Sequence, residues 1–158
     1  MAGIGEASAI ATFVPIGFSL ATSLTTYIGD VKDAPDEIAS LAVEIDATLR
    51  LVEELEVLLT SNKATGGWND NGVAFAIKCR RDSERVISKL LKLLTKSKSS
   101  VAGTGAVSHK DIDISLFNRV LWPRFKPKVE VAKRELERTR IDILLARDLY
   151  KAKTGRVS

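Results

Sequence analysis

Six basic side chains at intervals of three and four residues form the clearest pattern of binding groups in this chain. They are Lys78, Arg81, Arg85, Lys89, Lys92 and Lys96. In a helix this spacing confines all six to an arc of about 80°, and we call this arc the basic stripe. Each cation near an anionic bilayer contributes on the order of 1 kcal/mol to binding.

The basic stripe predicts an anionic partner, which can be a phospholipid surface or the acidic helix expected at residues 35–61. A face that is merely solvated is the alternative. Solvated faces usually carry interleaved acids for pairs between positions i and i+4, whereas Asp82 and Glu84 lie off this arc. We therefore expect Lys78, Arg81, Arg85, Lys89, Lys92 and Lys96 to bind lipid headgroups.

The other reactive groups do not combine into a catalytic or metal site. Cys79 and His109 are each the only residue of their kind, so they cannot provide the usual ligand set for zinc. The Gly103–Gly105 segment follows no strand and lacks the Gly-Lys-Ser/Thr ending of a phosphate loop. We find no nucleophile beside a base, so we expect no enzyme, metal or cofactor. A single cysteine also suits a reducing compartment.

Residues 7–29, between Glu6 and Asp30, carry no formal charge over twenty-three positions. As a helix this segment would reach roughly 35 Å, against about 30 Å for a hydrocarbon core. Seven Ser or Thr residues, together with Pro15 and Gly17, distinguish it from a plain hydrophobic span. The acidic start also lacks the basic region of a signal peptide.

This first segment has two different faces when it is drawn as a helix. Hydroxyl side chains gather on one side, and apolar side chains gather on the other. Such a helix can pack in a bundle core, which is the commoner role, and it can also enter lipid, because hydroxyls can bond to their own helix. We predict that the membrane-inserting residues are Ile10, Phe13, Val14, Gly17, Phe18, Leu20, Ala21, Leu24 and Ile28.

Charge is divided unevenly between the halves of this 158-residue chain, whose net charge is +4. Residues 1–71 hold eleven acids and three bases, whereas residues 72–158 hold nine acids and twenty-one bases. The two halves can attract each other within one bundle, and the basic excess can also face an anionic partner. Nucleic acid is not expected, because the acidic half would be repelled by phosphate and no recognition motif is present.

Apolar residues recur at threes and fours in several segments, which predicts helices. We expect one at 35–61, capped by Asp33 and stopped by Asn62 and Gly66-Gly67, and another at 72–96, capped by Asp70 or Asn71. The loop at 62–71 carries Trp68, which we expect to fold back over the end of a bundle, although a Trp can also anchor at a membrane interface.

The C-terminal part predicts a short helix at 115–122, ended or kinked at Pro123 and Pro127, and a last helix at 128–153. The last helix has a coiled-coil-like seam, formed by Val129, Ala132, Leu136, Thr139, Ile143, Ala146 and Tyr150. No run alternates with period two, so no sheet is expected. The predicted fold is an all-α, up-and-down bundle of four to five helices, forming a single domain over 1–158. Its core is formed by the second, third and last helices, with the first helix packed against them.

The first segment and the turn that follows it carry a resemblance to a known family. The sequence from Tyr27 to Ile38, YIGDVKDAPDEI, follows the small and apolar segment and leads into a leucine-rich acidic helix. Over about residues 4–62 this resembles the HeLo-like N-terminal domain of fungal cell-death and NOD-like receptor proteins. That domain is a helical bundle related to the executioner bundle of the mixed-lineage kinase-like pseudokinase and to plant coiled-coil resistance domains.

The resemblance implies a membrane-targeting toxin of fungal programmed cell death, heterokaryon incompatibility or innate immunity. Oligomerisation would free the N-terminal helix to permeabilise the plasma membrane, and the domain would be cytoplasmic at rest. The implied partners are anionic membrane lipids, other copies of the chain, and an upstream NOD-like receptor or amyloid-signalling protein. The alternative is a helical adaptor or oligomerisation module that does not lyse membranes.

Overall fold

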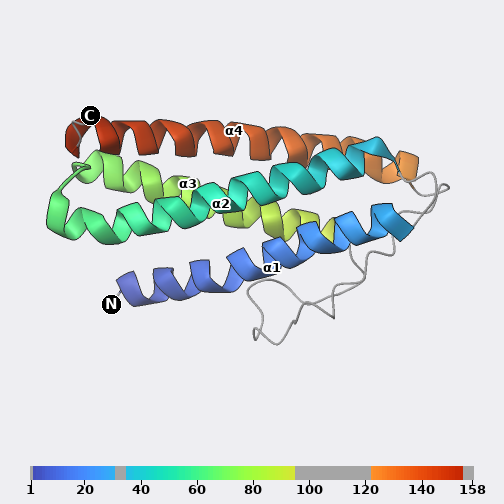
Figure 1. The fold of residues 1–158 in the computed structure, drawn as a ribbon, viewed down its shortest axis with the longest axis horizontal. Helices are drawn as coiled ribbons and strands as arrows, with labels where there is room; N and C mark the ends of the chain where they lie inside the picture. The colour runs from blue at the N-terminus through green and yellow to red at the C-terminus, as the bar shows by residue number, and fades with distance from the viewer. Residues whose placement is uncertain (1, 31–34, 95–121, 155–158) are drawn as a thin grey trace.

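The computed structural model describes residues 2–30, 35–94 and 122–154, with side chains for 13–30, 35–94 and 123–153. Four helices run up and down along one long axis (Figure 1). They are α1 (Ala2–Asp30), α2 (Asp36–Thr65), α3 (Asp70–Leu94) and α4 (Trp122–Thr154). No strand occurs among the described residues. The prediction of an all-α, up-and-down bundle is therefore confirmed.

Helices α2 and α3 lie between the other two helices (Figure 1). Helix α1 contacts α2 and α3, and α4 contacts the same two helices, but within the described residues α1 and α4 do not meet. This arrangement agrees with the prediction that the first helix packs against a core made by the other three. The predicted short helix at 115–122 lies outside the described residues, apart from Trp122, which begins α4.

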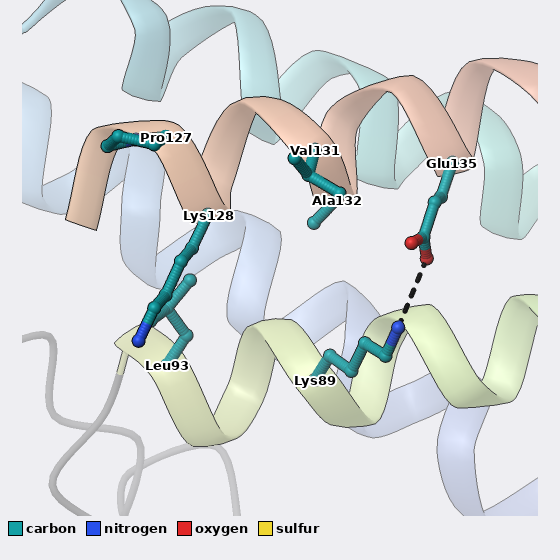
Figure 2. Close-up of a pocket in the computed structure, with 7 residues that line it drawn as sticks. All are labelled: Lys89, Leu93, Pro127, Lys128, Val131, Ala132 and Glu135. Atoms are coloured by element: carbon teal, nitrogen blue, oxygen red, sulfur yellow. Dashed lines mark ion pairs between the residues drawn. The ribbon is translucent and has the colours of Figure 1, made fainter.

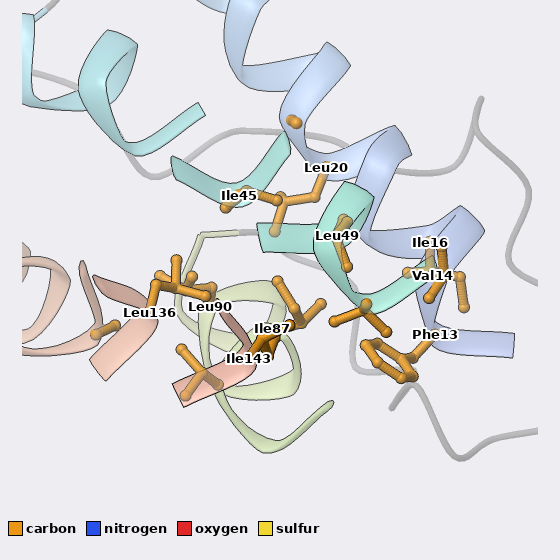
Figure 3. Packing of buried hydrophobic residues seen from close by; sticks show 14 of the residues in the cluster. Phe13, Val14, Ile16, Leu20, Ile45, Leu49, Ile87, Leu90, Leu136 and Ile143 are labelled. Atoms are coloured by element: carbon orange, nitrogen blue, oxygen red, sulfur yellow. The ribbon is translucent and has the colours of Figure 1, made fainter. Parts of the chain in front are cut away.

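The core is a continuous apolar cluster to which all four helices contribute (Figure 3). Every residue of the predicted seam on α4 is buried in it, from Val129 to Tyr150. A spacing of threes and fours keeps one face of a straight helix turned toward its neighbours. The largest fully buried side chains are Phe13, Leu20, Leu24, Ile38, Leu41, Ile45, Leu49, Leu55, Ile87, Leu90, Leu94 and Leu136.

The corner between α2 and α3 differs from the prediction in its details. Helix α2 continues to Thr65 and ends at Gly66, which adopts the left-handed conformation (φ 62°) and donates its N–H to the Asn62 carbonyl at 2.9 Å. Neither Asp70 nor Asn71 caps α3. Instead, Asn69 Oδ1 accepts a hydrogen bond from the Gly72 N–H at 2.8 Å.

At the other end of α2, the N-cap is Pro35, which makes no side-chain cap hydrogen bond. The predicted cap, Asp33, lies outside the described residues.

The prediction of a break before the last helix is wrong. Helix α4 starts at Trp122 and continues through Pro123 and Pro127 without interruption. A proline in the first turn loses nothing, because the first N–H groups of a helix have no partner within it. Pro127 removes only one backbone hydrogen bond near the start of α4, and the long buried stretch that follows packs on α2 and α3.

Trp68 connects the α2–α3 corner to the C-terminal part of α4 through a hydrogen bond and a ring contact. Its indole Nε1 donates a hydrogen bond to the Ala146 carbonyl at 2.9 Å, and its ring meets Tyr150 edge-on with centroids 4.8 Å apart. The Tyr150 hydroxyl is hydrogen-bonded to Thr65 Oγ1. The Trp68 backbone N–H is held by Asn62 Oδ1 at 2.7 Å. This buried Trp therefore folds back over the bundle end, as predicted.

Candidate functional site

The basic stripe lies on the outer face of α3. Its five described members, Lys78, Arg81, Arg85, Lys89 and Lys92, are all exposed, whereas Lys96 lies outside the described residues. The opposite face of the same helix is buried and includes Cys79, Val86 and Leu90. The members of the basic stripe share one exposed face because their spacings of three and four residues repeat nearly once per helical turn.

The expectation that the basic stripe lacks pairs with acids is wrong, because Asp82 reaches two of its members from beside the arc. Its carboxylate is 2.8 Å from Lys78 Nζ and 3.1 Å from an Arg85 guanidinium nitrogen. The hydrogen bond to Asp82 raises the pKa of Lys78 above its ordinary value. Lys89 Nζ lies 3.5 Å from a carboxylate oxygen of Glu135 on α4. Exposed pairs of this kind contribute little to stability, and they partly neutralise the basic stripe.

Five acidic residues of α2 are matched by bases that lie outside the basic stripe. Three of them face α4, in the pairs Glu37–Lys126 (3.2 Å), Glu44–Arg140 (3.0 Å), Glu54–Arg147 (3.5 Å) and Glu54–Lys151 (3.7 Å). The other two pairs are Glu56–Arg80 (3.5 Å), which joins α2 to a buried Arg of α3, and Asp46–Arg50 (2.8 Å) within α2. The two halves of the chain therefore neutralise each other mainly between α2 and α4.

The predicted membrane-inserting face of α1 is the face that packs against α2 and α3. Phe18 and Ile28 are partly buried, and the side chain of Ile10 lies outside the description. The remaining predicted residues are all buried: Phe13, Val14, Gly17, Leu20, Ala21 and Leu24. In this state the apolar face of α1 is part of the core, so it could reach lipid only after leaving the bundle.

Gly17 allows α1 to approach α2 closely. A Cβ atom at this position would lie 2.6 Å from Leu49 Cδ1 and 3.4 Å from Leu49 Cγ, and Leu49 is fully buried. Pro15 is exposed on the other side of α1, which passes both residues without a break. Proline and glycine both disfavour the interior of a helix, but neither Pro15 nor Gly17 ends α1.

The hydroxyl side of α1 is only partly the polar face that the sequence predicts. Thr22 and Thr26 are exposed, whereas Ser19 is buried. Thr25 Oγ1 bonds back to the Ala21 carbonyl at 3.0 Å, which is how a hydroxyl satisfies its donor within its own helix. Within the described part of the chain, no helix is long and apolar enough to cross a membrane.

Two apolar grooves lie between α3 and α4. The groove shown in Figure 2 has a volume of about 420 Å³, and its lining includes Val131 and Ala132 of α4 and Leu93 of α3. Lys128 of α4 and Lys89 of α3 extend across it from opposite sides. The second groove, of the same volume, lies at the other end of α4, beside Trp68, Phe75 and Leu149. These linings suit aliphatic groups, and neither groove contains a pair of catalytic side chains.

The thiol of Cys79 is buried, and desolvation by burial raises its pKa from 9.0 to about 12. Such a thiol stays protonated at neutral pH and is a poor nucleophile. Among the described residues, no group of three or more His, Cys, Asp or Glu side chains could hold a metal ion. Comparisons with protein families, with curated proteins and with solved structures find no match to this chain.

Proposed function

We propose that this chain is a membrane-targeting helical bundle domain that executes cell death, without enzymatic activity. Oligomerisation would release α1, whose apolar face would enter an anionic membrane and permeabilise it, while the basic stripe contacts the lipid headgroups. The domain would be cytoplasmic at rest and would act at the plasma membrane. Upstream control would come from a NOD-like receptor or an amyloid-signalling protein, as the family resemblance suggests.

The observation that carries this proposal is the different attachment of α1 and α4. Ion pairs to Glu37, Glu44 and Glu54 of α2 and to Lys89 of α3, together with the Trp68 corner, join α4 to the rest of the bundle. Helix α1 has only two side chains that are charged at neutral pH, Glu6 and Asp30, and it packs on α2 and α3 through an uncharged face. A helix attached in this way can leave while α2, α3 and α4 remain joined.

The energetics favour a docked α1 in water and permit its release at a membrane. Burying one large apolar side chain stabilises the folded state by about 1.5–3 kcal/mol, and Phe13, Leu20 and Leu24 are each almost completely buried. Release into water would forfeit that gain, whereas entry of the same face into hydrocarbon would recover it. The hydroxyl side chains of α1 cost far less in lipid than charges would.

A reversible cross-link between α1 and α2 tests the release of α1. A Cβ on Gly17 would lie 3.4 Å from Leu49 Cγ, which is one bond from Leu49 Cβ. This approach suits a disulfide, in which the two Cβ atoms lie about 3.5–4.5 Å apart. The double variant Gly17→Cys/Leu49→Cys, fused to a tetramerising coiled coil, should therefore release dye from phosphatidylserine liposomes only after reduction.

The same sample before and after reduction is the matched control, because only the cross-link changes. A parent fusion treated with the same reductant controls for effects on the liposomes. Equal leakage from the oxidised and reduced variants would refute the release of α1. A tetrameric parent that binds liposomes without leakage would instead favour a non-lytic adaptor.

One observation also favours that second candidate, a helical adaptor or oligomerisation module. All six of the large hydrophobic side chains that the described residues expose lie on α2 and α4, and none of them belongs to α1. Exposed apolar side chains concentrated on two helices are typical of a surface that meets another protein. Such a module would keep α1 docked throughout, so the cross-link would leave its activity unchanged.

A further inference from the structure

The two large exposed apolar residues of α2 and two of the four on α4 follow the same repeat, which Ile141 and Leu149 do not share. On α2 they are Val43 and Val57, with exposed fractions of 66% and 62%. On α4, Val131 and Leu145, each 50% exposed, are separated by the same fourteen residues. Fourteen residues are two heptads and span about 21 Å of helix. The two helices therefore present equally spaced apolar contacts on their outer faces.

Each pair belongs to a longer line of exposed residues at intervals of seven. The α2 line consists of Asp36, Val43, Arg50, Val57 and Ala64. The α4 line consists of Arg124, Val131, Arg138, Leu145 and Ala152. All ten residues are exposed, and the two lines match position by position. At the N-terminal end of each line the residues have opposite charges, and at the C-terminal end both are Ala. Between these ends, each line has a central Arg with one apolar residue before it and one after it.

We infer that the α2 line of one copy docks in parallel on the α4 line of a second copy. This register places Asp36 beside Arg124 of the second copy, Val43 beside its Val131 and Val57 beside its Leu145. The antiparallel register would also match the apolar residues, but it would place Asp36 beside an Ala. The pair of opposite charges therefore selects the parallel orientation.

The two central Arg residues do not oppose this register. Arg50 Nε lies 2.8 Å from Asp46 Oδ2, and Glu53 also attracts the Arg50 guanidinium. Together these three side chains carry one net negative charge, so they form an acceptable neighbour for Arg138 of the second copy. Arg50 also lies over the Phe18 ring, 5.8 Å from its centroid, so the α2 line touches α1 directly.

The parallel contact determines how copies are arranged. Helices α2 and α4 run in the same direction within one copy (Figure 1), so a parallel contact between copies relates them by rotation about an axis along the bundle. The two surfaces differ, so the contact is heterologous and can repeat until a ring closes. All α1 helices would then start at one end of the ring. This last consequence rests on the proposed function, because it is there that α1 meets the membrane.

The contact should be weak in a dilute solution. A single helix from each copy provides it, whereas stable interfaces bury about 1,200–2,000 Å². Effective concentrations near 1 mM, of the kind that short linkers produce, would favour it. Assembly would then depend on whatever gathers the copies together.

Sedimentation velocity of the full chain without lipid, at concentrations up to about 1 mM, tests the interface. The parent should assemble, and Val57→Glu or Leu145→Glu should each raise the concentration of half-assembly at least about tenfold, because a carboxylate would replace an apolar contact. A 1:1 mixture of the two variants should form dimers and nothing larger, since one intact α2 line meets one intact α4 line. The matched control is Thr26→Glu, which places the same charge at an exposed position of α1, and this variant should assemble like the parent.

Several outcomes would overturn the inference. One is a parent that stays monomeric at about 1 mM, and another is a mixture that stays monomeric. Loss of assembly in only one of the two variants would show that a helix pairs with its own counterpart instead. Thermal unfolding of each variant shows whether its fold is intact. Since no lipid is present, none of these outcomes decides whether α1 is released at membranes, and the disulfide experiment does not decide this interface.

Discussion

At the scale of single residues, Gly17 shows how one position can have two roles. In the sequence it resembles a weak point in α1, because glycine loses more conformational entropy than alanine on entering a helix. In the bundle its missing side chain is the space that the Leu49 side chain fills. The close packing of α1 on α2 therefore depends on glycine at this position.

We predict that Gly17→Ala destabilises the bundle by about 1–3 kcal/mol, because its methyl group would overlap the fully buried Leu49. The matched control is Gly29→Ala, near the end of the same helix, where nothing lies within 4 Å of an added Cβ. The control should gain at most about 0.5–1 kcal/mol from the better helix propensity of alanine, because Gly29 is the second-last residue of α1. Chemical denaturation monitored by circular dichroism measures both changes.

If Gly17→Ala is as stable as the parent, Leu49 moves aside freely, and the packing between α1 and α2 is looser than the structure shows. If both alanine variants gain stability, helix propensity alone decides their effect. Only opposite signs at the two positions support close packing at Gly17.

The placement of the basic stripe was predictable, but its ion pairs were not. Positions along one helix fix the direction of each Cα–Cβ bond, so the exposure of Lys78, Arg81 and Lys92 follows from their spacing. The partner of a long side chain depends on its reach and on neighbouring helices. Asp82 reaches two stripe residues from beside the arc, and Glu135 reaches Lys89 from α4.

At the scale of helices, the Trp68 corner separates the docking of α4 from that of α1. Its contacts run from the end of α2 to the Ala146 carbonyl and the Tyr150 ring of α4. Gly72 supports the indole from α3, since a Cβ there would lie 2.8 Å from Trp68 Cβ. Three helices therefore meet at one side chain, and none of the printed contacts of Trp68 involves a described side chain of α1.

We predict that Trp68→Ala lowers the free energy of unfolding by about 3–5 kcal/mol, the usual cost of truncating a buried Trp. Trp68→Phe should cost less, because it keeps most of the apolar contact and loses the hydrogen bond to Ala146, which is worth about 1 kcal/mol. Denaturant titration measures both values. Equal losses for the two variants would mean that the indole N–H, and not the packing of the ring, holds the corner.

The helices themselves follow from local patterns, whereas their junctions depend on the whole bundle. The seam from Val129 to Tyr150 was predictable because its period is that of a helix. The start of α4 was not, because Pro123 and Pro127 favour a break, and packing on α2 and α3 overrides that preference. The partners of Trp68 lie far away in the chain, and no local pattern identifies Ala146 or Tyr150.

At the scale of the whole molecule, the acidic first half of the chain and its basic second half form ion pairs mainly between α2 and α4. The acids of α2 meet Lys126, Arg140, Arg147 and Lys151 of α4, and Arg80 of α3. These bases lie outside the basic stripe, so the acids of α2 do not cover it. Asp82 and Glu135 pair with Lys78, Arg85 and Lys89, and all five described members of the stripe stay exposed.

We therefore predict that Arg81→Gln/Lys92→Gln weakens binding to phosphatidylserine vesicles by about 30-fold, at about 1 kcal/mol for each cation. The matched control, Arg134→Gln/Lys153→Gln, removes the same charge from exposed positions of α4 and should change binding much less. Co-sedimentation between about 0.05 and 0.5 M salt provides the measurement, because screening over roughly 10 Å at 0.1 M should weaken the parent steeply. Equal losses in both variants would mean that net charge alone drives binding, and no loss in either would leave the basic stripe a solvated face.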